Sequence, residues 1–357
     1  MGQTSLKGHV SEAGEGFDLV HARILRFFPE LVRELGGNPR PLMRQIGIRS
    51  AKKLSDGGSS ATYRQTIHLI ELAAAELRCP DFGMRLATVQ SGSKMFGPLG
   101  VAMKNSRTYG EALDYVSKHT YAHSLAARIW LKRSPARKIV LVGHDILVDG
   151  IPNKCQAIEQ IMLLGHLAAL EITGRRARVR KVHFRHQPIS PLKTYRRYFG
   201  CAVRFGQSED AVVFSEADLA CPIIQPDSQL YQAVTSFIDA SFTRFRPPLH
   251  AQVRGVILQF LGTDHCTNER IATALNLHPR TLHRRLRDES TSFQQVKDEV
   301  RRDALLYYIR QTGLDFATVS ERLGFAEQSV MTRICHRWFS VSPTELRSRG
   351  NRATPAS

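Results

Sequence analysis

Residues 268–288 read NERIATALNLHPRTLHRRLRD, and this stretch decides how the last third of the chain folds. The spacing of its apolar residues predicts a helix over 268–275 and a second helix over 280–288. Between the two helices, Asn276 begins a short turn. Asparagine is, after glycine, the residue that most readily accepts a left-handed backbone. The stretch therefore predicts a helix-turn-helix unit.

The same pattern returns at residues 316–339, which read FATVSERLGFAEQSVMTRICHRWF. A first helix is expected over 316–323 and a second over 327–339. Gly324 stands in the turn between them, where a left-handed backbone is needed. Two copies with matching turns indicate DNA binding more strongly than a single copy would.

The second helix of each unit carries polar side chains on its outward face. Arginine suits the guanine edge and glutamine the adenine edge of base pairs in the major groove, which the second helix of such a unit enters. The expected DNA-binding residues are Arg280, Thr281, His283, Arg284 and Arg287 in the first unit and Gln328, Ser329, Thr332, Arg333 and His336 in the second.

A long helix is predicted between the two units, over 293–311, from the spacing of its apolar residues. At about 1.5 Å per residue it spans roughly 30 Å. One turn of B-DNA is about 34 Å. Two recognition helices held that far apart can enter successive major grooves on one face of the duplex.

Upstream of residue 246 the pattern is mixed. Residues 125–132 and 138–148 are rich in β-branched residues and predict an antiparallel hairpin, and 178–186 alternates as a half-exposed strand does. Helices are expected over 19–35, around 42–46, and over 63–77, 108–119, 153–172 and 228–242.

These patterns predict an α/β (α+β) N-terminal domain followed by an all-α C-terminal domain, in which a long helix joins two helix-turn-helix units. We expect a flexible N-terminus at 1–16, a ligand-sensing and dimerisation domain at 17–246, a DNA-binding domain at 247–350 and a flexible tail at 351–357.

The chain of 357 residues carries a formal net charge of +18, which favours polyanions as partners. This charge is not concentrated in the part of the chain that holds the two helix-turn-helix units, however. From Gly262 to the end there are 15 Lys and Arg against 11 Asp and Glu, a balance of +4. The DNA-binding prediction therefore depends on the pattern of residues and not on the net charge.

Several other classes of protein are disfavoured. The six cysteines are scattered without a CxxC pair, which indicates reduced thiols and no zinc site. The chain lacks HExxH, GxSxG, P-loop and GxGxxG motifs, so we expect no enzyme, no catalytic residues, no metal and no cofactor. No stretch is long and apolar enough to span a membrane, and the first residues have no apolar signal core. A cytoplasmic protein is expected.

The C-terminal residues that carry these patterns resemble the AraC/XylS family of transcription regulators. The resemblance rests on Ile271-Ala272, on Pro279 to Leu286, and on Leu323-Gly324-Phe325 with Thr332-Arg333 and Ser342-Pro343. The upstream part of the chain looks like the arabinose-binding-type sensor domain of one branch of that family. The residues that carry this likeness are Phe96 to Gly100, Val182 to His186 and Tyr198-Phe199-Gly200.

This resemblance implies control of promoters on double-stranded DNA, usually activation through contact with RNA polymerase, together with a small-molecule effector and homodimers. It implies that the outward residues of each unit contact the bases in one major groove of the DNA. The sequence departs from the family at four positions: Met331 and Cys335 replace phenylalanines, and Ser290 and Ser340 replace glycines. Methionine and cysteine side chains can still pack in an apolar core, so we expect the domain to fold despite these replacements.

Two alternatives stay open at this point. A repressor of the same architecture has the same pattern. A DNA-alkylation repair protein is suggested by Ile334 to Arg337, which read ICHR, but the proline that precedes the reactive cysteine in such proteins is absent, and so is an upstream zinc-binding cysteine cluster. Cys335 is expected on the inward side of its helix, as a buried structural thiol.

Overall fold

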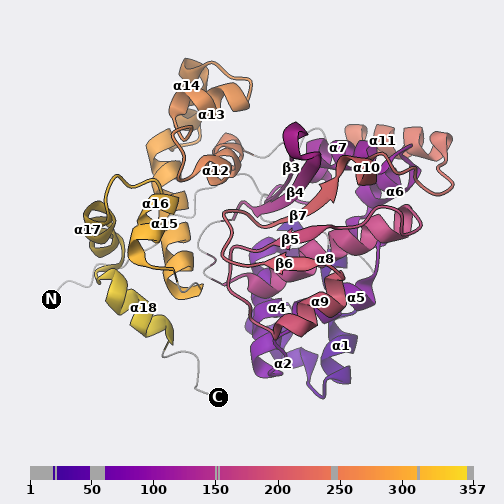
Figure 1. Cartoon of the computed structure of the whole chain (residues 1–357), viewed down its shortest axis with the longest axis horizontal. Coiled ribbons are helices and arrows are strands. Elements are labelled where there is room, and N and C mark those ends of the chain that lie inside the picture. Colours follow the sequence, from indigo (N-terminus) through magenta and orange to yellow (C-terminus); the bar gives the residue numbers. More distant parts are fainter. Residues whose placement is uncertain are drawn as a thin grey trace.

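The computed structural model describes residues 19–20, 22–48, 61–148, 151, 153–242, 248–311 and 314–351. The two segments that we expected to be flexible lie outside the described residues, except Asn351, which ends the last helix. Figure 1 shows a body that contains a β-sheet, made by residues 19–242, beside a purely helical body made by residues 248–351. These are called the N-terminal and C-terminal domains below. The mixed and all-α classes predicted from the sequence are confirmed.

The N-terminal domain is built on a five-stranded sheet with the strand order β3-β4-β7-β5-β6. Among the described strands of this sheet, only the β5–β6 pair is parallel. The strands are β3 (Ala127–Ser134), β4 (Ile139–Ile146), β5 (Lys181–His183), β6 (Ala202–Arg204) and β7 (Ala211–Ser215). A separate short pair joins β1 (Leu19–Val20) to β2 (Ala61–Thr62).

The helices of this domain cover one face of the sheet and its ends (Figure 1). They are α1 (Phe28–Glu34), α2 (Pro39–Gln45), α4 (Tyr63–Glu76), α5 (Phe82–Gln90), α6 (Pro98–Asn105), α7 (Tyr109–His119), α8 (Cys155–Ile172), α9 (Leu192–Phe199), α10 (Glu216–Leu219) and α11 (Ser228–Phe242). Short 3-10 turns are η1 (Ala22–Leu25), η2 (Ser93–Phe96), η3 (Thr120–Ala122) and η4 (Pro135–Arg137).

The predicted hairpin is confirmed: β3 and β4 pair antiparallel from Ala127 opposite Ile146 to Ser134 opposite Ile139. The helix predicted over 19–35 is wrong as a single helix. The segment forms a short strand, a 3-10 turn and then α1, because Phe27 adopts a left-handed backbone with φ of 66° and ends any continuous helix there.

The strand predicted over 178–186 is shorter than expected. Only Lys181–His183 pairs in the sheet, although Val179, Val182 and Phe184 are all buried, as the alternation requires. The backbone N–H of Arg178 is bound instead by the carboxylate of Asp218, at 3.2 Å. A side chain therefore replaces the partner strand at this end.

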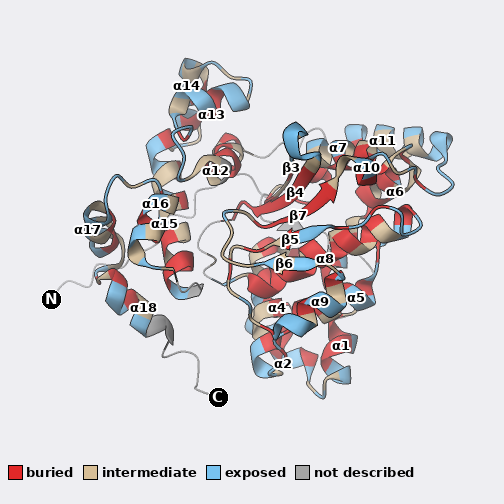
Figure 2. Cartoon of the chain, in the orientation of Figure 1, coloured by how far each residue is buried: buried red, intermediate tan, exposed pale blue. Residues whose placement is uncertain are grey.

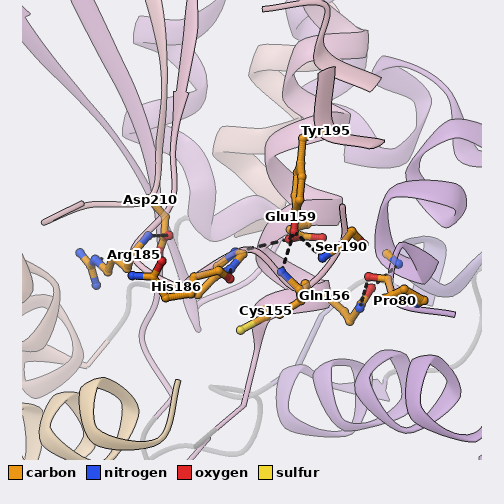
Figure 3. A network of polar contacts seen from close by, with 12 residues as sticks. Pro80, Cys155, Gln156, Glu159, Arg185, His186, Ser190, Tyr195 and Asp210 are labelled. Atoms are coloured by element: carbon orange, nitrogen blue, oxygen red, sulfur yellow. Dashed lines mark hydrogen bonds and ion pairs between the residues drawn. The ribbon is translucent and has the colours of Figure 1, made fainter. Parts of the chain in front are cut away.

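Helix α8 is almost fully buried and carries polar side chains that tie it to its neighbours (Figure 3). The hydroxyl of Tyr195 donates a 2.6 Å hydrogen bond to Oε1 of Glu159, and Nε2 of His186 lies 3.6 Å from the same oxygen. The amide of Gln156 donates a 2.7 Å bond to the carbonyl oxygen of Pro80. Burial raises the pKa of Glu159 well above its usual value, which favours its protonated form.

The C-terminal domain is entirely helical among its described residues. Its helices are α12 (Leu249–Phe260), α13 (Asn268–Ala274), α14 (Pro279–Asp288), α15 (Phe293–Gln311), α16 (Phe316–Arg322), α17 (Gln328–Phe339) and α18 (Pro343–Asn351). Helix α15 occupies the predicted range 293–311. It contributes Val296 and Val300 to the core of the first unit and Leu305 and Ile309 to the core of the second. Two separate apolar cores are thus joined by one helix.

Candidate DNA-binding interface

The turn of each helix-turn-helix unit has the backbone that its residue type favours. Asn276 has φ of 54° and Gly324 has φ of 65°, both in the left-handed region. In the first unit the ring of His278 accepts a 3.2 Å hydrogen bond from the backbone N–H of Arg280 and so caps α14. Leu282 and Leu286 of α14 and Met331 and Cys335 of α17 are buried, which turns the opposite faces of these helices outward.

The predicted site residues lie on those outward faces. Figure 2 shows that α14 and α17 both carry exposed stretches. All ten are exposed except Thr281 and Thr332, which are half-buried. The structure brings five of them together: one shallow hollow on α17 is lined by Gln328, Ser329, Thr332, Arg333 and His336. The five residues of α14 form a second group on their own helix.

The arginines of these two groups have no partner among the residues that the structure describes. Within the described part of the chain, no hydrogen bond or ion pair engages the guanidinium groups of Arg280, Arg284, Arg287 or Arg333. Two hydroxyls in the α17 group are partly used, since Ser329 bonds to Glu327 at 3.0 Å and Thr332 bonds to the carbonyl oxygen of Gln328 at 3.0 Å. Unpaired guanidiniums on an exposed helix face suit phosphates and guanine edges.

Sequence reasoning missed Arg301, which holds the turn before α17. From α15 its guanidinium donates hydrogen bonds of 3.0 Å to the carbonyl oxygen of Leu323 and 2.6 Å to that of Gly324. It also lies 4.8 Å from the centre of the Phe325 ring. The long helix therefore holds the turn directly. A single arginine on an amphipathic helix gives no sequence signal for such a role.

The two domains contact each other at the second unit and also through α12 of the first unit, which lies against β4. From α16, Nη2 of Arg322 donates a 2.7 Å hydrogen bond to the carbonyl oxygen of Gly206 in the N-terminal domain. Cys155, the first residue of α8, is buried in the apolar core of the second unit. A cavity of about 40 Å³ between the domains is lined by charged groups from both, including Lys154, Arg185 and Asp303.

The cysteine chemistry of a repair protein is not supported by the surroundings of Cys335. Its side chain is fully buried and lies 3.5 Å from the carbonyl oxygen of Val341. Burial raises the pKa of the thiol to about 11, which disfavours the reactive thiolate. The described residues contain no group of three or more His, Cys, Asp or Glu side chains placed to hold a metal ion. In the same part of the chain, no helix has the length and apolar character needed to cross a membrane.

Comparison with known proteins gives two family matches. Residues 36–223 match the model of the arabinose-binding domain of the AraC transcription regulator, and residues 271–349 match a helix-turn-helix domain model. The transcriptional regulator VirS of Mycobacterium tuberculosis is 31% identical over 332 residues, which cover 93% of this chain and 97% of VirS.

Two further proteins are similar over most of their length. The ornithine utilization regulator of Pseudomonas aeruginosa is 25% identical over 330 residues, covering 89% of this chain and 93% of that protein. The crystal structure of the regulator CdpR from Pseudomonas aeruginosa aligns with a TM-score of 0.43 and 20% identity, over 89% of this chain and 98% of CdpR. VirS and CdpR are named as transcriptional regulators, and the third protein is named as a regulator of ornithine utilization.

Proposed function

Since the chain belongs to the AraC-type helix-turn-helix transcription regulators with an arabinose-binding-type N-terminal domain, we propose that it activates specific promoters in response to a small-molecule effector. The observation that carries the proposal is the pair of exposed polar faces on α14 and α17, whose arginines have no partner among the described residues. Helix α15 packs in the apolar cores of both units and so connects the two helices that carry these faces.

In the proposed complex, α14 and α17 enter two successive major grooves. One groove is contacted by the α14 residues Arg280, Thr281, His283, Arg284 and Arg287. The other groove is contacted by the five residues that line the hollow on α17. Arg284 and Arg333 are proposed to bind guanines, because their side chains are exposed and free to present both N–H donors to one base. Gln328 is the corresponding candidate for an adenine.

The proposed effector response uses the contact between the domains. A ligand that binds the N-terminal domain better in one arrangement shifts the population toward that arrangement. Arg322 and Cys155 connect the N-terminal domain to the second unit. Such a shift changes how the second unit is presented to DNA. Activation is proposed to proceed through contact with RNA polymerase, and the active species is proposed to be a homodimer.

The test begins with selection of bound sequences from a random duplex library, followed by affinity measurements on the selected site. Arg284→Ala and Arg333→Ala should each weaken specific binding by about 1–3 kcal/mol and relax the base preference in one half of the site. The matched control is Arg33→Ala, which removes an exposed charge from α1 in the N-terminal domain. Specific affinity equal to wild type in both α14 and α17 variants would exclude the assignment.

Transcription from the selected promoter with purified RNA polymerase then decides the sign of control. Higher output in the presence of the protein supports activation, and lower output identifies a repressor with the same DNA-binding surface.

A further inference from the structure

The N-terminal domain contains a cavity of about 80 Å³ between the sheet and the helices that cover it. Strand β4 contributes Val142, Gly143 and His144, and α8 contributes Met162, Leu164 and Gly165. Since about 10–15 Å³ of such space holds one water-sized group, the cavity has room for several non-hydrogen atoms. Helices α4, α6 and α7, strands β3 and β7 and the turns η1 and η2 also contribute to the walls.

The lining is almost entirely apolar. Among the residues that the structure describes, the lining contains no Asp, Glu, Lys or Arg, and its polar side chains are Tyr63, Tyr109, His123 and His144. The hydroxyl of Tyr63 lies 2.8 Å from Nε2 of His144, and both residues are buried. Burial lowers the pKa of His144 to about 3, so the ring is neutral at physiological pH.

This lining selects against two classes of ligand. A carboxylate or phosphate would be buried with no Lys or Arg among the described wall residues to pair with it. A sugar would bury several hydroxyls, and the few polar side chains present cannot bind all of them. An uncharged apolar molecule has neither cost, and its hydrocarbon surface matches the methionine, leucine and valine side chains of the wall.

We propose that this cavity is the effector site and that its ligand is a small, uncharged, mostly apolar molecule with one hydrogen-bonding group directed at the Tyr63–His144 pair. The proposal rests on the effector response proposed above and specifies its ligand class. The apolar wall, which has four polar side chains among its described residues, distinguishes this site from a carbohydrate site, despite the name of the matching domain model.

The cavity is connected to the contact between the domains through two elements. Helix α8 lines the cavity with Ile161 and Met162, and its first residue, Cys155, lies in the core of the second helix-turn-helix unit. Strand β4 lines the cavity with His144, and Ile146 lines the charged space between the domains. A ligand that moves α8 or β4 therefore acts on the position of the C-terminal domain.

Gly165 offers a way to fill the cavity without disturbing the fold. It lies within α8, and a Cβ atom built on it meets no atom within 4 Å. Gly165→Leu therefore places a side chain into open space while replacing glycine by a good helix former. Most other substitutions in the wall would remove packing that the core needs.

The experiment is calorimetric titration of the full chain with benzyl alcohol, benzoate and L-arabinose. Benzyl alcohol should bind, and benzoate and L-arabinose should bind at least about 100-fold more weakly. Gly165→Leu should lose at least about tenfold in affinity for benzyl alcohol with an unchanged circular dichroism spectrum and an undiminished melting temperature. The control Val101→Leu, which enlarges an exposed side chain on α6 outside the cavity, should bind as wild type does.

Equal binding of benzoate, preferential binding of L-arabinose, or unchanged binding by Gly165→Leu would each overturn the proposal. These results do not depend on DNA and so are separate from the test of the proposed function. If benzyl alcohol binds in the cavity but leaves promoter affinity unchanged, the ligand class stands and the effector response fails. If promoter affinity responds to an effector equally in wild type and Gly165→Leu, the response stands and this cavity is excluded as its site.

Discussion

Nη2 of Arg322, on the first helix of the second DNA-binding unit, donates a 2.7 Å hydrogen bond to the carbonyl oxygen of Gly206, which follows strand β6 of the N-terminal domain. Nη1 of the same guanidinium donates a 3.3 Å bond to the carbonyl oxygen of Gln207. One side chain therefore binds two successive carbonyl groups of the other domain, and the rigid, planar guanidinium fork is better pre-organised for this than an ammonium group.

Replacing Arg322 should loosen the contact between the domains. Arg322→Ala removes both hydrogen bonds and leaves two carbonyl groups without this partner, so the docked arrangement loses population. We expect a larger radius of gyration in small-angle X-ray scattering coupled to size exclusion. Arg322→Lys, which keeps the charge and loses the fork, should be intermediate. A scattering curve identical to wild type for Arg322→Ala would show that the contact does not hold the domains together.

Ser340 and Ser290 should each be improved by glycine. They follow α17 and α14 with φ of 58° and 56°, a left-handed backbone that costs a residue with a side chain about 1 kcal/mol. Ser340→Gly and Ser290→Gly are therefore expected to stabilise the C-terminal domain by up to about that amount in urea unfolding.

A control for this prediction stands two residues away. The hydroxyl of Ser342 accepts a 3.2 Å hydrogen bond from the backbone N–H of Glu345 and caps α18, so Ser342→Ala should instead cost about 1 kcal/mol. If Ser340→Gly lowered the free energy of unfolding, the serine side chain would have to make a contact that stabilises the domain by more than its left-handed backbone costs.

Glu289 should be important for joining α12 to the first unit. Its carboxylate accepts hydrogen bonds of 2.6 Å and 2.8 Å from the backbone N–H groups of Leu249 and His250 at the start of α12, where the N-cap residue, Pro248, has no side-chain cap. Glu289→Gln removes the charge and should cost about 1–2 kcal/mol. Glu321→Gln, an exposed change on α16, should be neutral within about 0.5 kcal/mol.

The pH dependence of this contact has a definite sign. Burial opposes ionisation of Glu289, but the hydrogen bonds from His250 and from the α12 backbone outweigh it and hold the pKa below its usual value. The stabilisation is therefore complete above the unfolded-state pKa, near 4.5, and is lost as the pH falls through the lower folded-state pKa. The Gln variant should lack this acid-dependent loss; a stability difference between the two proteins that persists below both pKa values would contradict it.

His144 should make the N-terminal domain sensitive to mild acid. Burial lowers its pKa from 6.5 to about 3, so the unfolded chain takes up the proton first as the pH falls. The contribution of the neutral ring to the free energy of unfolding is therefore complete above pH 6.5. This free energy declines as the pH falls toward 3, by about 1.4 kcal/mol for each pH unit. Denaturant unfolding of wild type and His144→Gln between pH 4 and 7 measures the difference in slope. Parallel pH profiles would show that folding does not lower the pKa of the ring.

The C-terminal domain was predictable because its signals are local. Left-handed turns at Asn276 and Gly324 and apolar spacing on either side define each unit within about twenty residues, and α15 follows from its own periodicity. The ten expected DNA-contacting residues lie on exposed or half-exposed helix faces for the same reason, since burying Leu282 or Cys335 turns the neighbouring polar residues outward.

The N-terminal domain was only partly predictable. The β3–β4 hairpin and helices α4, α7 and α11 match their predicted ranges closely. The break at Phe27 and the placement of β5 between β6 and β7 did not follow from local patterns. A strand's neighbours are chosen by long-range pairing, and a short strand such as β5 carries too few residues to show its partners.

The sequence by itself determined the two DNA-binding units, the helix between them and the faces they expose, because helical periodicity and turn chemistry act over a few residues. Only the tertiary structure decided which carbonyl groups Arg301 and Arg322 bind and which side chains surround the cavity beside Tyr63 and His144. Those contacts join segments that lie far apart along the chain. Their geometry exists only after the sheet, α8 and the helical domain have packed together, so no local pattern encodes it.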